Sequence, residues 1–204
     1  MKINFTKMHG LGNDFILIDC RQIKLDNLSE LSKRLCHRRF GVGADQMLLL
    51  SDSSLADFMM RIFNADGSEV EMCGNGIRCL AKYIWDRNLS NNNILIIETL
   101  AGIMKPEKAG EMVKVDMGEP VLEPERIPVN ISKGLGGRGI VDHLLKIEDR
   151  EFRITCVSMG NPHTIIFVDG LSHFPVTYYG PLIENHHLCP ERTNVEFIEV
   201  LNPA

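Results

Sequence analysis

One stretch decides the fold of this chain: Asn64-Ala65-Asp66-Gly67-Ser68-Glu69-Val70-Glu71-Met72-Cys73-Gly74-Asn75-Gly76-Ile77-Arg78-Cys79. It runs from a strand end through a turn to a cysteine and a glycine-rich segment. The apolar residues that follow have the three-and-four spacing of a single helix face, at Ile77, Leu80, Ala81, Ile84 and Trp85. The pattern predicts a helix from Asn75 to about Asn88 with one buried stripe.

Cys73 lies immediately before the predicted helix start, which Gly74-Asn75-Gly76 marks. Unpaired backbone N–H groups and the positive end of the helix dipole converge at such a terminus. A terminus of this kind binds carboxylate or phosphate, and it lowers the pKa of a nearby thiol from about 8.5. We therefore expect an anion cradle and a thiolate in one place. A second interpretation stays open, in which Cys73 is a small buried side chain and the glycines form an ordinary turn.

Four segments together resemble diaminopimelate epimerases, and with the later Asn194 they extend the resemblance over residues 8–194. The segments are Met8-His9-Gly10-Leu11-Gly12-Asn13-Asp14-Phe15, Phe63-Asn64-Ala65-Asp66-Gly67-Ser68, Cys73-Gly74-Asn75-Gly76-Ile77-Arg78-Cys79 and Ser158-Met159-Gly160-Asn161-Pro162-His163. Members of that family have two similar domains that face one another, and they often form homodimers. The resemblance therefore implies the same domain pair here and a homodimer as one form of the protein.

The composition limits the classes of function. A chain of 204 residues with 44% hydrophobic content can form one large domain or two small ones. The net charge of −5 argues against a nucleic-acid partner. No apolar run reaches the roughly 20 residues of a membrane span, and no signal peptide is recognisable, so we expect a cytoplasmic protein without membrane contact. The six cysteines lack metal-ligand spacing, which predicts no metal site and reduced thiols.

Strand-like runs surround the predicted helix on both sides, and a proline-rich passage begins at Gly118-Glu119-Pro120. That passage is typical of a boundary between domains. We therefore predict an α+β fold with domains at residues 1–117 and 118–204. The two domains should be pseudo-symmetric, each with mostly antiparallel strands wrapped around a central helix.

A faint internal repeat supports two related halves. Gln46 follows Asn13 by 33 positions, and Asn194 follows Asn161 by the same number. Cys73 follows Gln46 by 27 positions, and the same step from Asn194 leads to position 221, whereas the chain given ends at 204. We therefore expect the second domain to be incomplete, lacking its central helix and the family's second cysteine. This 204-residue chain alone should not epimerise its substrate at a useful rate.

The resemblance also implies the chemistry. Family members convert LL-diaminopimelate to the meso isomer without pyridoxal phosphate or another cofactor, with two cysteines as acid and base. Cys73 is then the catalytic cysteine of this chain, and Gly74 and Asn75 bind the reacting carboxylate through their backbone N–H groups. The remaining substrate-binding residues that the resemblance implies are amides, namely Asn13, Gln46, Asn64, Asn161 and Asn194.

Two other functions compete with this interpretation. One is a different cofactor-independent racemase or isomerase of the same fold, against which the Met8-to-Phe15 and Asn64-to-Gly67 segments argue. The other is a non-catalytic fragment that binds an amino acid or assists assembly. Taken without the resemblance, Asn64 is more typical of a turn start, and His163 is more typical of a structural histidine.

Overall fold

The structure is a computed structural model that describes residues 2–130 and 139–202. Its contacts divide the chain into two compact units, Met1–Met117 and Gly118–Ala204. Across the described residues, no helix combines the length and apolar character needed to cross a membrane.

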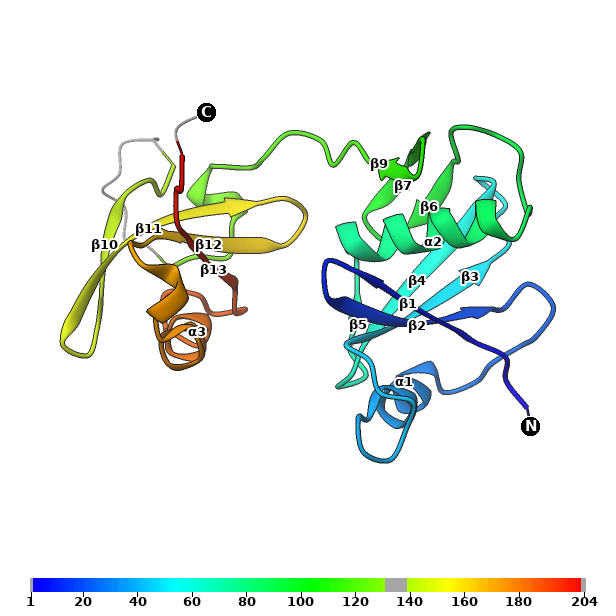
Figure 1. The fold of residues 1–204 in the computed structure, drawn as a ribbon, viewed down its shortest axis with the longest axis horizontal. Coiled ribbons are helices and arrows are strands. Elements are labelled where there is room, and N and C mark those ends of the chain that lie inside the picture. Colours follow the sequence, from blue (N-terminus) through cyan, green and yellow to red (C-terminus); the bar gives the residue numbers. More distant parts are fainter. Residues whose placement is uncertain (1, 131–138, 203–204) are drawn as a thin grey trace. The chain divides into compact units, whose positions relative to one another are not determined.

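Unit 1 is built on a seven-stranded sheet with the order β1-β2-β3-β4-β6-β7, in which β5 pairs with β4 (Figure 1). The β2–β3 and β4–β6 pairs are parallel, and the other pairs are antiparallel. A separate hairpin joins β8 and β9. The strands are β1 (Thr6–Gly10), β2 (Asn13–Asp19), β3 (Gln46–Ser51), β4 (Phe58–Asn64), β5 (Glu69–Val70), β6 (Ile97–Thr99), β7 (Gly102–Met104), β8 (Glu107–Ala109) and β9 (Met112–Lys114).

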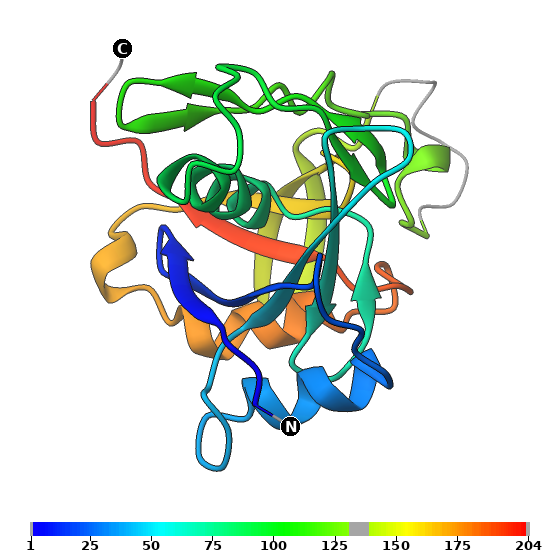
Figure 2. The ribbon, with the colours of Figure 1, turned by 90° about the vertical axis from the view of Figure 1, so that its right-hand side faces the viewer.

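Helix α2 (Gly74–Asp86) covers one face of this sheet, and α1 (Leu28–Cys36) covers the other (Figures 1 and 2). The period-two alternation of a strand separates the two cores, because Phe15 and Leu17 pack toward α2 whereas Ile16 and Ile18 pack toward α1. The predicted stripe of α2 is confirmed as buried: Ile77, Leu80, Ala81 and Ile84 are each 0% exposed. The helix is thus the centre of the larger core.

Helix α1 is followed by a tight return of the chain. It ends at Cys36, and the chain then curls back so that the carbonyl of Leu35 accepts hydrogen bonds from the N–H groups of Val42 and Gly43. Gly41 lies so close to this helix end that an added Cβ would be 2.1 Å from the carbonyl oxygen of Arg34. The glycine therefore permits the close return of the chain after the helix, several residues beyond the helix end.

Unit 2 contains a four-stranded sheet with the order β10-β11-β12-β13 and the helix α3 (Val176–Glu184). Its core joins Ile154, Cys156 and Ile166 of the sheet to Ile183 of α3. The strands are β10 (His143–Ile147), β11 (Arg150–Ser158), β12 (Pro162–Phe167) and β13 (Asn194–Ile198), and two short 3-10 turns, η1 (Pro124–Arg126) and η2 (Leu171–His173), complete the unit.

The two units repeat one topology, a β-hairpin whose second strand leads through a helix into a parallel strand. In unit 1, Phe15 of β2 pairs with Gln46 of β3. In unit 2, His163 of β12 pairs with Asn194 of β13. The equal spacing of the amides therefore corresponds to equal strand register. The hairpin turns match as well, since Gly12 and Gly160 have φ values of 90° and 96°, which favour glycine.

Candidate active site

Cys73 is the N-cap residue of α2, as its position before Gly74-Asn75-Gly76 suggested. Its backbone is extended, with φ −145° and ψ 115°, and its Sγ accepts a hydrogen bond from the N–H of Gly76 at 3.4 Å. A Cβ at Gly76 would lie 3.2 Å from Leu48 Cδ2 and 3.4 Å from Cys73 Cβ. The glycine thus lets the helix start pack tightly between the sheet and the thiol.

The expected lowering of the Cys73 pKa is wrong. Burial raises the pKa of this thiol above its usual value, although N–H groups of Gly76 and Asn75 and the charge of Arg78 act in the opposite direction. Desolvation disfavours the thiolate more strongly than the helix terminus favours it. At neutral pH the side chain is therefore a thiol, and the donors around it can stabilise a thiolate once a proton has left.

The other cysteines differ from Cys73 in setting. Cys36, Cys79, Cys156 and Cys189 are buried, and Cys20 is half-buried. Burial raises the pKa of Cys79 to about 11, and burial together with the nearby Asp19 raises that of Cys20 to about 11. Among the described residues, Cys73 alone combines partial exposure with a position at a helix N-terminus.

The start of α2 lies beside the first hairpin. Gly10, which pairs with Asn13, comes so close to Asn75 that an added Cβ would be 3.3 Å from the Asn75 Cβ. The Arg78 guanidinium donates a hydrogen bond to Asn75 Oδ1. The start of α2 is thus beside the hairpin that carries Asn13, and the binding of a carboxylate by Gly74 and Asn75 stays a prediction.

The unit 1 amides Gln46 and Asn64 meet on adjacent strands. They are register partners of β3 and β4, and Gln46 Nε2 donates to Asn64 Oδ1 at 2.8 Å. Two buried carbonyl oxygens, Asn13 Oδ1 and Gln46 Oε1, have no hydrogen-bond partner in the structure. Buried acceptors without partners are rare in folded proteins, so these two indicate a place for a donor from a ligand or water.

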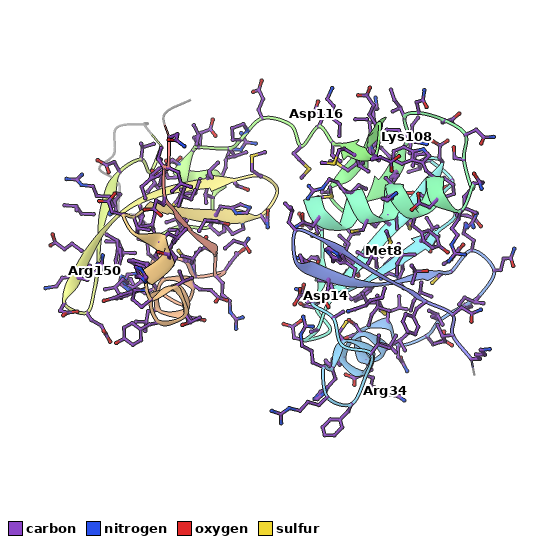
Figure 3. All side chains as sticks on the ribbon, in the orientation of Figure 1. Met8, Asp14, Arg34, Lys108, Asp116 and Arg150 are labelled. Atoms are coloured by element: carbon purple, nitrogen blue, oxygen red, sulfur yellow. The ribbon has the colours of Figure 1, made fainter. Side chains whose placement is uncertain are left out.

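An ionic network that the sequence analysis missed supports these amides. Asp14 and Asp45 are tied reciprocally, because the N–H of each donates to a carboxylate oxygen of the other, at 3.0 and 2.9 Å. Arg38 Nη2 bridges their Oδ1 atoms at 2.8 and 2.7 Å, and Lys7 Nζ lies 2.6 Å from Asp14 Oδ2. Asp14, labelled in Figure 3, directly follows Asn13, and Asp45 directly precedes Gln46.

This network has an electrostatic consequence. The Arg38 guanidinium, with Lys7, holds the pKa of Asp14 well below its usual range despite partial burial. The only signal in the sequence was the aspartate beside each amide, because the Arg38 side chain could be read as an ordinary helix C-terminal charge. In the structure Arg38 lies beyond the end of α1 and holds together the two segments that carry Asn13 and Gln46.

In unit 2, Asn161 directly precedes β12, and Asn194 is the first residue of the neighbouring strand β13. Asn194 Nδ2 donates to the carbonyl oxygen of Pro162 at 3.0 Å. Asn161 Oδ1 lies 3.0 Å from His163 Nε2, and His163 Nδ1 lies 2.6 Å from Glu196 Oε1. His163, considered structural from the sequence, therefore connects a predicted substrate-binding amide to a carboxylate. Within the part of the chain that the structure describes, no cluster of side chains could hold a metal ion.

Sequence comparisons place the chain among known proteins. The family profile described as Diaminopimelate epimerase matches residues 5–123. A protein of Acetivibrio thermocellus with that name is 48% identical over 98% of this chain and 72% of its own length. A protein of the same name from Carboxydothermus hydrogenoformans is 50% identical over 99% of this chain and 73% of its own length.

Solved structures of lower identity share the fold. A protein of the PhzF phenazine-biosynthesis family from Bacillus anthracis has a TM-score of 0.65 at 20% identity, over 99% of this chain and 69% of its own. A probable proline racemase of Agrobacterium radiobacter has a TM-score of 0.67 at 12% identity, over 96% of this chain and 66% of its own. These likenesses support the predicted α+β class of strand-rich domains.

Proposed function

Because this chain belongs to the diaminopimelate epimerase family, we propose that it interconverts LL- and meso-diaminopimelate. It is then an isomerase that inverts one α-carbon of a small amino-acid substrate. Two of the relatives that carry this name are 48% and 50% identical to nearly the whole chain, whereas the proline racemase and PhzF likenesses extend only to the fold. The sequence relationship therefore favours diaminopimelate over the substrates of the other racemases and isomerases.

Cys73 is the proposed acid/base group. The α-proton of an amino acid is very weakly acidic, so its removal requires a base held against the α-carbon and stabilisation of the charge that develops on the carboxylate. Backbone N–H groups at the start of α2 donate hydrogen bonds to Cys73 Sγ, and these hydrogen bonds favour its thiolate form. Inversion also needs a second group on the opposite face, for which we propose a second thiol, as the family resemblance implies.

The carboxylate of the reacting centre is proposed to bind at Gly74 and Asn75. Backbone N–H groups at a helix N-terminus are fixed donors, so they stabilise developing negative charge without reorganising during the reaction. The amides Asn13, Gln46, Asn64, Asn161 and Asn194 are proposed to bind the rest of the substrate. Neutral amides suit a zwitterionic substrate because they contain both donors and acceptors.

The position of Cys73 as the N-cap of α2 carries this proposal. The test is deuterium incorporation at the α-carbon of LL-diaminopimelate in heavy water, followed by mass spectrometry of the isolated isomers. It is run on this chain and its variants, each supplied in trans with a segment that carries the family's second cysteine. Cys73→Ala should lower the exchange rate by several orders of magnitude, because the members of a catalytic pair act as a unit. Cys20→Ala removes a half-buried thiol that directly follows β2. It is the matched control and should retain exchange. Substantial exchange by the Cys73→Ala protein would refute the assignment.

We further propose a cytoplasmic homodimer. The family resemblance supports the dimer, because family members often pair, and an enzyme of biosynthesis that acts on a small-molecule substrate suits the cytoplasm. Size-exclusion chromatography with light scattering would measure the molar mass of the protein in solution. A monomer at micromolar concentration would contradict the dimer.

A further inference from the structure

A chain of four polar groups leads from a turn to the buried oxygen of Gln46. Ser68 Oγ donates to Asp66 Oδ1 at 2.5 Å, and Asn64 Nδ2 donates to Ser68 Oγ at 3.0 Å. Gln46 Nε2 then donates to Asn64 Oδ1 at 2.8 Å. The last atom of the chain, Gln46 Oε1, is buried and has no partner.

The direction of every bond in this chain follows from the carboxylate at its start. An ionised carboxylate only accepts hydrogen bonds, so the single hydroxyl proton of Ser68 is committed to Asp66. The Ser68 oxygen must then accept from the NH₂ group of Asn64, which turns the carbonyl of Asn64 toward Gln46. Gln46 must in turn donate through its NH₂ group. The two amide orientations are therefore fixed by the network and are not free to interchange oxygen and nitrogen.

The turn that holds Asp66 and Ser68 is itself well supported. Asp66 Oδ1 also accepts from the backbone N–H of Ser68 at 2.9 Å, and the N–H of Asn64 donates to the carbonyl of Ser68 at 2.8 Å. Gly67 has φ 84°, and a Cβ there would lie 2.5 Å from Ser29 Oγ of α1. The turn is packed on a helix, so its carboxylate is a fixed starting point.

We propose that Asp66 and Ser68 are positioning residues that make Gln46 present a carbonyl oxygen to the substrate. With this orientation Gln46 accepts from a donor, and it selects an ammonium group over a carboxylate at that place. We call the hydrogen-bond chain from Asp66 through Ser68 and Asn64 to Gln46 the relay. Without it the amides of Asn64 and Gln46 can reverse together, and Gln46 would then present its NH₂ group, which favours a carboxylate. This inference rests on the proposed function, in which Gln46 binds the amino-acid substrate.

The first test needs no substrate. In the isotope-labelled protein, a scalar coupling across the hydrogen bond from Gln46 Nε2 to the Asn64 carbonyl carbon reports the orientation. The coupling should be present in the wild type and in Ser68→Thr, which keeps the hydroxyl. It should be lost in Ser68→Ala and in Asp66→Asn, whose amide can donate and so reverses the relay. Persistence of the coupling in both of these variants would overturn the proposal.

The second test measures selectivity. Affinities are compared for meso-diaminopimelate and for pimelate, which has the same two carboxylates but no ammonium group. Ser68→Ala and Asp66→Asn should lower the preference for diaminopimelate by about tenfold or more, the scale of one hydrogen bond to a charged group. The KM for diaminopimelate should rise more than kcat falls, and Ser68→Thr should restore the preference. An unchanged preference in a variant that has lost the coupling would also overturn the proposal.

Ser53→Ala is the matched control, because Ser53 Oγ likewise donates to a carboxylate, Glu98 Oε2, at 2.5 Å in a turn of the same unit. Ser53→Ala should change neither the coupling nor the preference. The outcome also separates this inference from the proposed function. If the wild-type protein neither binds nor epimerises diaminopimelate, the proposed function fails, whereas the coupling experiment still decides whether Asp66 and Ser68 orient Gln46.

Discussion

At the scale of single residues, the state of Cys73 shows how two local effects compete. The helix terminus favours the thiolate, but removal of the sulfur from water disfavours it more, and the pKa of Cys73 rises. A thiol with a raised pKa is a weaker acid, and its thiolate is a stronger base. A stronger base suits the removal of the very weakly acidic α-proton of an amino acid.

The rate of alkylation at Cys73 should therefore rise only at high pH. With a limiting amount of iodoacetamide and no ligand, Cys73 should be the main site, because four of the other cysteines are buried and burial raises the pKa of Cys20 to about 11. The rate should keep rising beyond pH 8.5, since the reactive thiolate forms only as pH approaches the raised pKa. Peptide mapping at several pH values measures both. A rate that levels off below pH 8, or predominant labelling elsewhere, would contradict the assignment.

Asp14 gives a stability prediction with a definite sign. Its folded pKa lies below the unfolded value of about 3.9, so its stabilising effect is complete above that value and is lost as pH falls through the folded pKa. Asp14→Asn should lower the free energy of unfolding at pH 7 by about 1 kcal/mol. The difference from wild type should shrink below pH 4. Urea unfolding across this range measures it, with Asp86→Asn, at an exposed i,i+4 pair with Lys82, as the control. A difference that grows on acidification would contradict the pairing.

At the scale of elements, the sequence predicted those features that depend on local periodicity. The stripe from Ile77 to Ile84 specified α2 and its buried face, and Cys73 was placed at its start. The equal 33-residue spacings from Asn13 to Gln46 and from Asn161 to Asn194 predicted two related halves, and the parallel strand pairs of the two units have the same register. The relay from Asp66 to Gln46 could not be predicted, because it depends on the pairing of β3 with β4. The raised pKa of Cys73 could not be predicted from the sequence either, because the burial that causes it is a property of the packed structure.

At the scale of the whole molecule, the two units have separate hydrophobic cores. The core around α2 contains Ile84, and the core of unit 2 contains Phe152, whose ring also packs under the guanidinium of Arg150, labelled in Figure 3, at 5.2 Å. The described core clusters have no residue in common. We therefore expect the units to open independently of one another.

Hydrogen exchange would test this independence. Ile84→Ala should cost about 2–5 kcal/mol, as typical for a buried isoleucine, and should accelerate amide exchange in residues 2–117. Phe152→Ala should cost about 3–5 kcal/mol and should accelerate exchange in residues 139–202. Lys82→Ala, on the exposed side of α2, should do neither. Equal acceleration in both units by either core variant would show that they unfold as one.

The shared register of the two parallel strand pairs has a consequence for how this architecture tolerates change. Strand pairing sets the place of Gln46 opposite Phe15 and of Asn194 opposite His163. The lengths of the connections that lead there, through α1 in one unit and α3 in the other, do not set it, and Arg38 of the first connection braces the paired segments through Asp14 and Asp45. Insertions in these connections should therefore leave the amides in place, whereas a slip of one residue in β3 or β13 would turn each amide to the opposite face of its sheet. In related chains, the connections through α1 and α3 can therefore vary in length, whereas the residues of the paired strands must keep their register.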